Sequence, residues 1–532
     1  MRRYQLPILL LLSLLFLMTG ATEPSRTADE GFAVYNAARV HDGFLPYRDF
    51  YAIYAPGQFY AMAWVFKVFG ASLSVSRGYD VVLRLVLVLI VYLITRKLIS
   101  EKWAIVPSVL VALLLGTCGF HGYAMFPGLI LSLLSVLCLF EFFTSKRTAW
   151  LIAGGVATGA TEIFRQDVGL YTVASFSIVL LVFAFSLTPK ANLQRMLRWE
   201  AIYLAAAAVV VIPVCLAFVI AGSAEDIWVD LFVFPATILH GIRSLPFPTF
   251  FINPLPLSNL RAEAGGWIRF YFPPIVCLCT LVQIALTWRT ALQSERGSLR
   301  IYRTLALVIL GGMLFAQVWS RNDRIHQVPV TVVALILTAK LLADFDFAKR
   351  LLPVRFLAAA VIAILAMVYV VSPLKRWNAT KSLRALIGCP TPNGRAGCVA
   401  IEPDQAQAID FVQKEIPRGE RIFIGAPRHD RVFTGDLMSY FLSDRHSAVK
   451  YQEILPRLTN TLPVQQRIVE DLKSEHVRCI LLYSGFDYIV EENASTENSG
   501  VTYLDDFIHN NFRLVQQFGT YTIWMNTSGA SR

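Results

Sequence analysis

Long apolar segments separated by short polar loops fill the first 372 residues of the chain. About eleven are long enough to cross roughly 30 Å of hydrocarbon as helices, and they lie near residues 4–22, 79–99, 103–119, 126–144, 149–164, 169–187, 201–221, 271–288, 301–319, 328–345 and 354–372. Beyond residue 380, helical spacing and short strand-like runs alternate. The pattern predicts a polytopic α-helical membrane protein (1–372) followed by an α/β domain (380–532).

Charged residues are few and gather in alternate short loops. The chain of 532 residues is 55% hydrophobic and 16% charged, with a mean hydropathy of +0.53. The positive-inside rule places the basic loops and the N-terminus in the cytoplasm, and loop 23–78 and everything after residue 373 outside. We therefore expect an integral membrane protein of the bacterial inner membrane with a periplasmic C-terminal domain. Topology also accounts for the net charge of +11, so no nucleic-acid partner is expected.

Two short segments of the first exterior loop, Gly31–Val40 and Gly57–Phe69, are apolar or amphipathic but too short to span a bilayer. With the tyrosines around them, they are predicted to lie as helices at the headgroup level. In the C-terminal domain, Cys389 and Cys398 bracket a loop rich in Pro and Gly. Because an oxidising compartment permits disulfides, we expect these two cysteines to be bonded. No metal-ligand spacing such as CxxC or HExxH is present.

An acidic pair, Asp29-Glu30, directly follows the first apolar segment. The segments Gly43-Phe-Leu-Pro-Tyr-Arg-Asp-Phe50 and Tyr54-Ala-Pro-Gly57 come after it. Together they resemble the first exterior loop of GT-C glycosyltransferases, the polytopic enzymes of the protein mannosyltransferase and aminoarabinose transferase type. The succession of many spans, a long first exterior loop and a C-terminal exterior domain is similar to that family over the whole chain.

The resemblance implies an inverting glycosyltransferase that moves a sugar from a polyprenyl-phosphate donor to a lipid, glycan or protein acceptor. Asp29 matches the family's general base, which takes the acceptor's proton as its oxygen attacks the anomeric carbon. Glu30 is assigned beside it, and capping of the next helix is the alternative role for either carboxylate. The Glu-Lys-Pro-Pro of the aminoarabinose transferases is replaced here by Ala55-Pro56-Gly57, so a divalent metal stays an open cofactor.

Four further residues are candidates for substrate binding near the first exterior loop and the fifth span. Asp49 and Tyr54 belong to the motif itself, and their alternatives are a local ion pair with Arg48 and membrane anchoring, respectively. Arg165 and Asp167 lie at the exterior end of the fifth span, where ionised groups are costly unless they pair or line a wet cavity. A structural pair between these two residues is the equally weighted alternative.

A basic cluster ends the ninth span on the exterior side. It contains Arg321, Arg324 and His326, with Asp323 between them. Arginine matches the oxygens of a phosphate, and the leaving group of the implied reaction is a polyprenyl phosphate whose developing charge needs stabilising. The cluster is therefore predicted to hold that phosphate, while contact with lipid headgroups is the alternative.

Two other classes of function stay open. A lipid or glycan transporter or flippase would spread polar groups and broken helices through the midplane of the membrane. A non-catalytic envelope assembly protein would work through its C-terminal domain and would not need Asp29. The candidate polar residues collect at one face of the membrane, and this favours the enzyme.

Overall fold

Ten of the described helices coincide with ten of the predicted spans. The computed structural model describes residues 4–25, 28–187, 192–248, 260–344, 361, 364–365, 368 and 394–527. The helices are α1 (Gln5–Leu17), α4 (Leu73–Leu98), α5 (Glu101–Gly116), α6 (Met125–Ser145), α7 (Thr148–Phe164), α8 (Gln166–Leu187), α9 (Asn192–Ile220), α12 (Leu260–Ala291), α13 (Glu295–Ser320) and α14 (Arg324–Asp344). Most of the eleventh predicted span, 354–372, lies outside the described residues.

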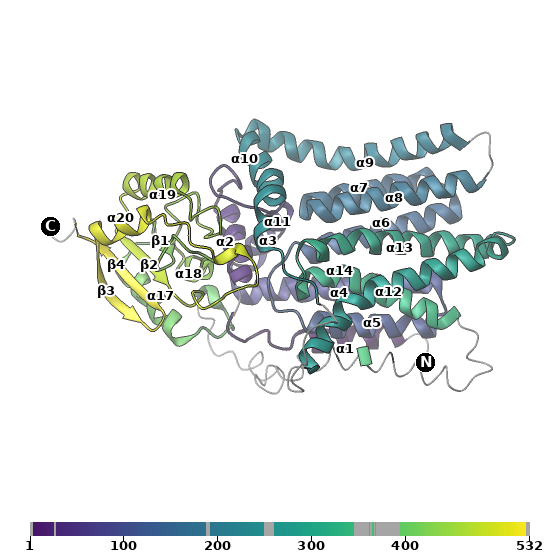
Figure 1. Ribbon diagram of the computed structural model, residues 1–532, viewed down its shortest axis with the longest axis horizontal. Helices are drawn as coiled ribbons and strands as arrows, with labels where there is room; N and C mark the ends of the chain where they lie inside the picture. Colours follow the sequence, from purple (N-terminus) through teal and green to yellow (C-terminus); the bar gives the residue numbers. More distant parts are fainter. Residues whose placement is uncertain are drawn as a thin grey trace.

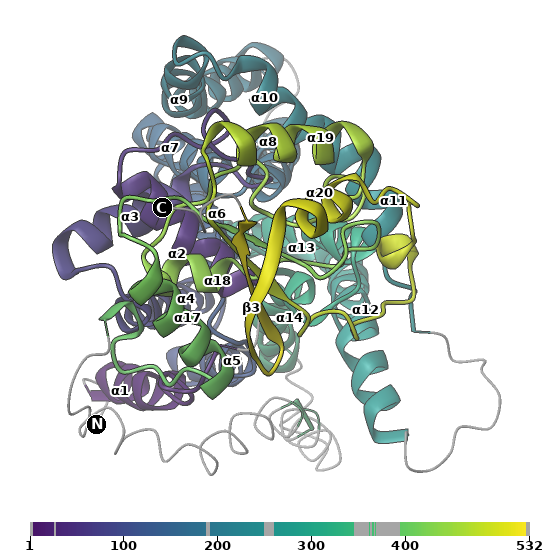
Figure 2. The same cartoon turned by 90° about the vertical axis from the view of Figure 1, so that its left-hand side faces the viewer.

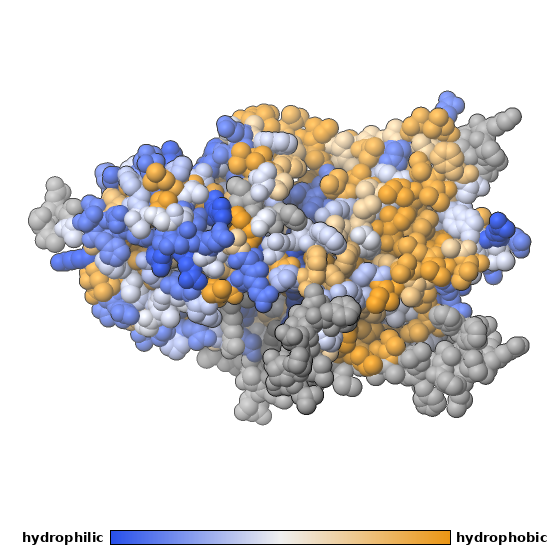
Figure 3. All heavy atoms as spheres, in the orientation of Figure 1, coloured by the Kyte–Doolittle hydropathy of each residue, from blue (hydrophilic) through white to orange (hydrophobic). Residues whose placement is uncertain are grey.

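These helices form a bundle that is apolar on its outside as well as in its interior. Figure 1 shows them running side by side, and Figure 3 shows a largely hydrophobic surface over the bundle and a largely hydrophilic one over the C-terminal part. Among the described helices, six are long and apolar enough to cross a membrane: α6, α8, α9, α12, α13 and α14. A surface of this kind is expected where lipid takes the place of water, and the chain is an integral membrane protein.

Small residues bring two of the spans into close contact. Gly155 and Gly159 lie one turn apart on α7, against α9. A Cβ atom on Gly155 would lie 2.3 Å from the carbonyl oxygen of Tyr203, and one on Gly159 would lie 2.5 Å from that of Ala207. Helices packed in lipid commonly approach each other over such small residues, because close backbone contact replaces the hydrophobic effect as the source of attraction.

The C-terminal domain is a four-stranded sheet with helices packed on it. Its elements are α17 (Pro403–Glu415), β1 (Phe423–Gly425), α18 (Leu437–Ser443), α19 (Leu462–Ser474), β2 (Cys479–Tyr483), α20 (Tyr503–Asn511), β3 (Phe512–Phe518) and β4 (Tyr521–Asn526). The strand order is β1-β2-β4-β3; β1 and β2 are parallel and the other pairs antiparallel. Figure 2 shows this domain in front of the bundle. The predicted α/β character is correct, but the edge strand β3 was not predicted.

The two short helices of the first exterior loop differ in their surroundings. On α3 (Gly57–Phe69), Trp64 and Phe69 are exposed, which fits the predicted position at the membrane surface. On α2 (Ala28–His41), residues 30–39 are all buried, and the helix packs against both α3 and α18. The prediction of a headgroup-level helix is therefore wrong for α2. Its tightly covered surface joins the bundle to the C-terminal domain.

Among the described residues, five shorter helical segments lie after α9 or in the C-terminal part of the chain. They are α10 (Ala224–Trp228), the π-helix η2 (Val229–Leu239), α11 (His240–Arg243) and the 3-10 helices η4 (Gly394–Ala396) and η5 (Ala494–Thr496). Of these, η2 and α11 follow α9 and lie between the bundle and the C-terminal domain in Figure 1. They therefore place polar residues of the loop 222–248 near the end of the bundle that faces the domain.

Candidate active site

The acidic pair at the start of α2 is divided between two surroundings. Glu30 is buried and receives two hydrogen bonds from Arg77 of α4, from Nε at 2.7 Å and from Nη2 at 2.9 Å. The same guanidinium donates to the carbonyl oxygens of Ala21 and Glu23. Glu30 thus points away from its neighbour and fixes the start of α2 to α4. Its carboxylate therefore belongs to a buried ion pair and does not share a cavity with the carboxylate of Asp29.

Asp29 lies on the opposite side of the helix start, with its side chain half exposed. Its Oδ2 accepts a hydrogen bond of 2.7 Å from the hydroxyl of Tyr123, in the loop between α5 and α6. The ring of His121, in the same loop, brings Nδ1 to 3.9 Å from that oxygen. Burial and the nearby charge of Asp29 raise the pKa of Tyr123 well above its usual value, so its hydroxyl stays a donor.

A cavity of about 290 Å³ opens at Asp29, and we call it the central cavity. It lies where one end of the bundle meets the C-terminal domain. Its lining includes the polar residues Asp29, Tyr54, Tyr123, Arg165, Arg243, Arg321, His326 and Glu453. Five residues singled out from the sequence, Asp29, Tyr54, Arg165, Arg321 and His326, are therefore brought together, although they come from four separate segments of the chain.

The arginines of the central cavity differ in how they are neutralised. Arg165 is paired with Asp167, Nε to Oδ1 at 2.8 Å. Arg321 is paired both with Asp323 at 2.7 Å and, through Nη1 at 3.0 Å, with Glu491 of the C-terminal domain. Arg243 makes no ion pair with any described residue, and its Nε is buried without a hydrogen-bond partner there. Its guanidinium carbon lies 5.1 Å from the ring centroid of Phe433, so Arg243 contacts an aromatic ring but forms no ion pair within the described part of the chain.

Tyr54 and His326 complete the rim that faces these arginines. The ring of Tyr54 lies 5.5 Å from the guanidinium carbon of Arg165, and burial raises the pKa of Tyr54 to about 12. The Nδ1 of His326 lies 2.7 Å from Oδ1 of Asp323, which also accepts the backbone N–H groups of Ile325 and His326. Asp323 therefore caps the start of α14 and orients both Arg321 and His326.

Besides Glu30, three of the predicted site residues do not line the central cavity. Asp49 pairs with Arg48 at 2.7 Å and accepts the backbone N–H of Leu45, as its local alternative anticipates. Arg324 is exposed and lines a separate hollow of about 30 Å³. Two residues of a helix are turned by about 200°, so His326 and Arg324 face opposite sides of α14. Asp167 lies beside the cavity, where it accepts hydrogen bonds from Arg165 and Gln317.

Two carboxylates of the C-terminal domain lie at or beside the central cavity, although no sequence motif predicted them. Glu453 lines the central cavity itself. Glu491 contacts Arg321, and its side chain is mostly buried. Both lie more than a hundred residues after the basic cluster, and no periodicity or spacing links them to it.

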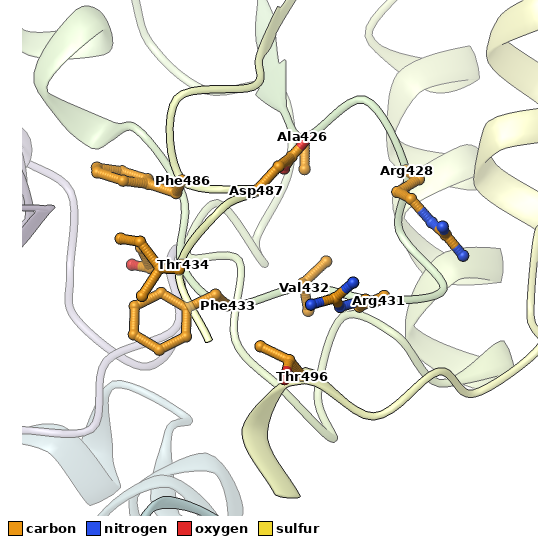
Figure 4. A pocket seen from close by; sticks show the side chains of 10 residues that line it. Ala426, Arg428, Arg431, Val432, Phe433, Thr434, Phe486, Asp487 and Thr496 are labelled. Atoms are coloured by element: carbon orange, nitrogen blue, oxygen red, sulfur yellow. The ribbon is translucent and has the colours of Figure 1, made fainter. Parts of the chain in front are cut away.

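Two further hollows adjoin the central cavity. The lateral groove, of about 440 Å³, shares Tyr54, Arg165 and Arg321 with it and adds apolar residues of η2, including Leu231, Phe232 and Pro235. The distal pocket, of about 250 Å³, lies in the C-terminal domain and shares Phe433, Thr434, Phe486 and Ile489. Figure 4 shows the last of these hollows, with Phe433, Thr434 and Phe486 toward one side and the basic Arg428 and Arg431 toward the other. The three hollows follow one another from the bundle into the C-terminal domain.

The predicted disulfide and the open question of a metal concern other residues. Cys398 is disulfide-bonded, and Cys389, its expected partner, lies outside the described residues. Within the described ranges, no three side chains of His, Cys, Asp or Glu gather as metal ligands do.

No protein-family model matches the chain, and no curated protein sequence does so. Among solved structures, the oligosaccharyltransferase AglB of Archaeoglobus fulgidus, in complex with an inhibitory peptide and a dolichol-phosphate, aligns with a TM-score of 0.57 over 100% of this chain and 75% of its own, at 13% identity. ArnT of Cupriavidus metallidurans in the apo state aligns with a TM-score of 0.56 over 99% of both chains, also at 13% identity.

A second structure of ArnT, bound to undecaprenyl phosphate, aligns with a TM-score of 0.50 over 99% of this chain and 98% of its own. AglB and ArnT are polytopic GT-C proteins with a C-terminal domain that contains a sheet. The chain described here therefore has the GT-C fold, as its first exterior loop suggested. At 13% identity, the likeness concerns the fold.

Proposed function

We propose that this protein is an inverting glycosyltransferase that moves a sugar from a polyprenyl-phosphate donor to an acceptor hydroxyl at the exterior face of the membrane. The observation that carries the proposal is the meeting of Asp29 and the unpaired Arg243 in one cavity. The first supplies a proton acceptor, and the second a cation for a phosphate. The GT-C fold, and the dolichol-phosphate and undecaprenyl phosphate held by AglB and ArnT, support this reading.

In the proposed step, the oxygen of the acceptor attacks the anomeric carbon of the donor sugar. The bond from that carbon to the phosphate oxygen breaks, and its electron pair stays on the departing polyprenyl phosphate. The acceptor's proton passes to the carboxylate of Asp29, whose Oδ2 is held by Tyr123. Arg243, with Arg321 and His326 around it, stabilises the charge that develops on the phosphate.

The three adjoining hollows give each part of the substrates a place. The lateral groove has apolar residues of η2 on one wall and opens between α8 and α13, so it suits the start of a polyprenyl chain. The central cavity receives the phosphate and its sugar. The distal pocket combines the aromatic rings of Phe433 and Phe486 with Arg431 and Asp487, a lining that suits a polar acceptor such as a glycan.

The test uses purified full-length protein, a panel of radiolabelled polyprenyl-phosphate sugars and membrane extract as the source of acceptor. We expect release of polyprenyl phosphate with wild type and a loss of about 10²- to 10⁴-fold in Asp29→Asn, as for removal of a general base. The matched control is Asp49→Asn, an aspartate of the same loop that lies off the cavity, and it is expected to keep its activity.

Two results would contradict the proposal. One is a wild-type protein that releases no polyprenyl phosphate from any sugar of the panel. The other is an Asp29→Asn protein that remains as active as Asp49→Asn. Movement of the intact donor across a vesicle membrane without sugar transfer would instead support the transporter class.

A further inference from the structure

Glu453 is held at the wall of the central cavity by the residues on either side of it. The backbone N–H of Tyr51 donates to the carbonyl oxygen of Lys450 at 3.0 Å. The amide of Gln452 donates to the carbonyl oxygen of Tyr51 at 3.2 Å. Leu455, on the other side, packs in a cluster with Ile53. A segment of the C-terminal domain is thus fixed on the first exterior loop, and Glu453 is delivered to a defined position.

The carboxyl of Glu453 is buried, and one of its two oxygens is unsatisfied within the described part of the chain. Glu453 is 8% exposed, and its Oε2 has no hydrogen-bond partner among the described residues. Leaving a buried polar atom without a hydrogen-bond partner is energetically unfavourable. A group in this condition that faces a cavity is well placed to be satisfied by whatever the cavity binds.

The groups around Glu453 favour its neutral form. Asp29 on α2, Asp230 on η2, and Tyr51 and Tyr54 of the first exterior loop face it, and Arg243 of α11 is the cation that faces it. Burial raises the pKa of Glu453 to about 8, and the charge of Asp29 adds to this effect. At pH 7 the carboxyl is therefore mostly protonated, and it can both donate and accept a hydrogen bond.

We propose that Glu453 is a sugar-binding residue: its neutral carboxyl hydrogen-bonds a hydroxyl group of the donor sugar in the central cavity. The inference rests on the proposed function. The donor's sugar is favoured because Glu453 lines the same cavity as Arg243 and Arg321, where the phosphate attached to that sugar would lie. The distal pocket, assigned to the acceptor, does not include Glu453. One side chain of the C-terminal domain would thereby take part in choosing the sugar.

The experiment compares binding of a polyprenyl-phosphate sugar with binding of bare polyprenyl phosphate, which carries no sugar hydroxyl. We expect Glu453→Ala to weaken binding of the sugar-bearing lipid about 10-fold or more and to leave the bare lipid within about 2-fold, a difference typical of losing a buried hydrogen bond. Glu453→Gln, which keeps a donor and an acceptor, should restore most of the affinity. Glu470→Gln, on the exposed face of α19, is the control and should change neither.

A second readout is the pH dependence of binding of the sugar-bearing lipid. Ionisation of Glu453 should reduce wild-type affinity for the sugar-bearing lipid above about pH 8, and this alkaline limb should be absent in Glu453→Gln. Equal weakening of both lipids by Glu453→Ala, or an unchanged alkaline limb in Glu453→Gln, would overturn the inference. Because these are binding measurements, the inference can fail while wild type still transfers sugar, and the proposed function can fail while the lipids still bind.

Discussion

Glu30, at the junction between α2 and α4, and Asp29, in the central cavity, are neighbours in the sequence. The junction and the cavity differ in whether their buried charged and polar groups are paired. At the junction, Glu30 and Arg77 satisfy each other through two hydrogen bonds, and the remaining donor of Arg77 reaches backbone carbonyls. In the cavity, Arg243 lacks an ion pair with any described residue, and Oε2 of Glu453 lacks a hydrogen bond there. Oppositely charged groups that pair fully stabilise the fold, whereas unsatisfied polar groups at a cavity wall are candidates for binding a ligand.

Glu30 and Asp29 should therefore differ in the effect of removing each carboxylate. Removing Glu30 would leave a buried guanidinium without its counter-charge, so the cost would fall on folding. Removing the charge of Asp29, which is half exposed, would leave no such defect, so the cost would fall on chemistry. If the proposed function is correct, this sequence motif has a structural residue and a catalytic residue at consecutive positions.

The largest effect on stability is expected from breaking the junction. Glu30→Ala should destabilise the protein by about 3–5 kcal/mol, as is typical when one partner of a buried ion pair is removed. Thermal unfolding in detergent, followed by loss of helical circular dichroism, measures it. The matched control is Asp410→Ala, which removes the acid of an exposed pair with Lys414 on α17 and should change the unfolding temperature little. Equal effects of the two variants would contradict the structural role of Glu30.

The arrangement of the spans could be predicted because apolar length alone determines which segments cross a bilayer. The meeting of Asp29, Arg165 and Arg321 followed from topology: each lies in a loop on the same side of the membrane. The paired charge of Asp80 and Arg84 inside α4 was also foreseeable, since they are one helical turn apart, and they lie 2.6 Å from each other. In each of these cases the information is local in the sequence.

Other features depend on contacts between distant segments, which no local pattern encodes. The edge strand β3 has a mostly exposed sequence, Phe-Arg-Leu-Val-Gln-Gln-Phe, without the alternation of a half-buried strand. The burial of α2 depends on α18, and the position of Glu453 depends on Tyr51. Arg324 and His326 face opposite sides of α14, and this could be predicted only with the start of the helix at residue 324 known. The site was therefore predictable as a location but not as a complete set of residues.

Removing the unpaired cation should have the next largest effect. Arg243→Ala is expected to raise the KM for the lipid donor about 10- to 100-fold, because a charged hydrogen bond to the phosphate is worth about 1.5–3 kcal/mol. Arg324→Ala, which removes an exposed arginine from a separate hollow, should leave that KM within about 2-fold. Steady-state kinetics at fixed acceptor concentration measures both. If Arg324→Ala had the larger effect, the phosphate would have to be placed on the other side of α14.

Glu453, the buried acid of the central cavity, should lower the stability of the protein at high pH. Because the pKa of Glu453 is raised to about 8 in the folded state, the folded protein keeps this proton while the unfolded chain loses it above about pH 4.5. The contribution of Glu453 to stability therefore falls as the pH rises from about 4.5 to 8. Glu453→Gln should gain stability relative to wild type as the pH rises from 5 to 9, by a few kcal/mol, because each pKa unit corresponds to about 1.4 kcal/mol. Unfolding temperatures at both pH values measure the change, and a constant difference would contradict it.

The smallest effect is expected from the hydrogen bond that orients Asp29. Tyr123→Phe removes the hydroxyl that donates to Oδ2 at 2.7 Å while keeping the ring against His121, whose centroid lies 4.7 Å away. A single hydrogen bond contributes about 1 kcal/mol, so kcat/KM should fall about 5-fold with no change in unfolding temperature. Tyr503→Phe, an exposed tyrosine at the start of α20, is the control. A loss as large as that of Asp29→Asn would mean that the Tyr123 hydroxyl itself relays the acceptor's proton, whereas no loss would mean that the cavity positions Asp29 without it.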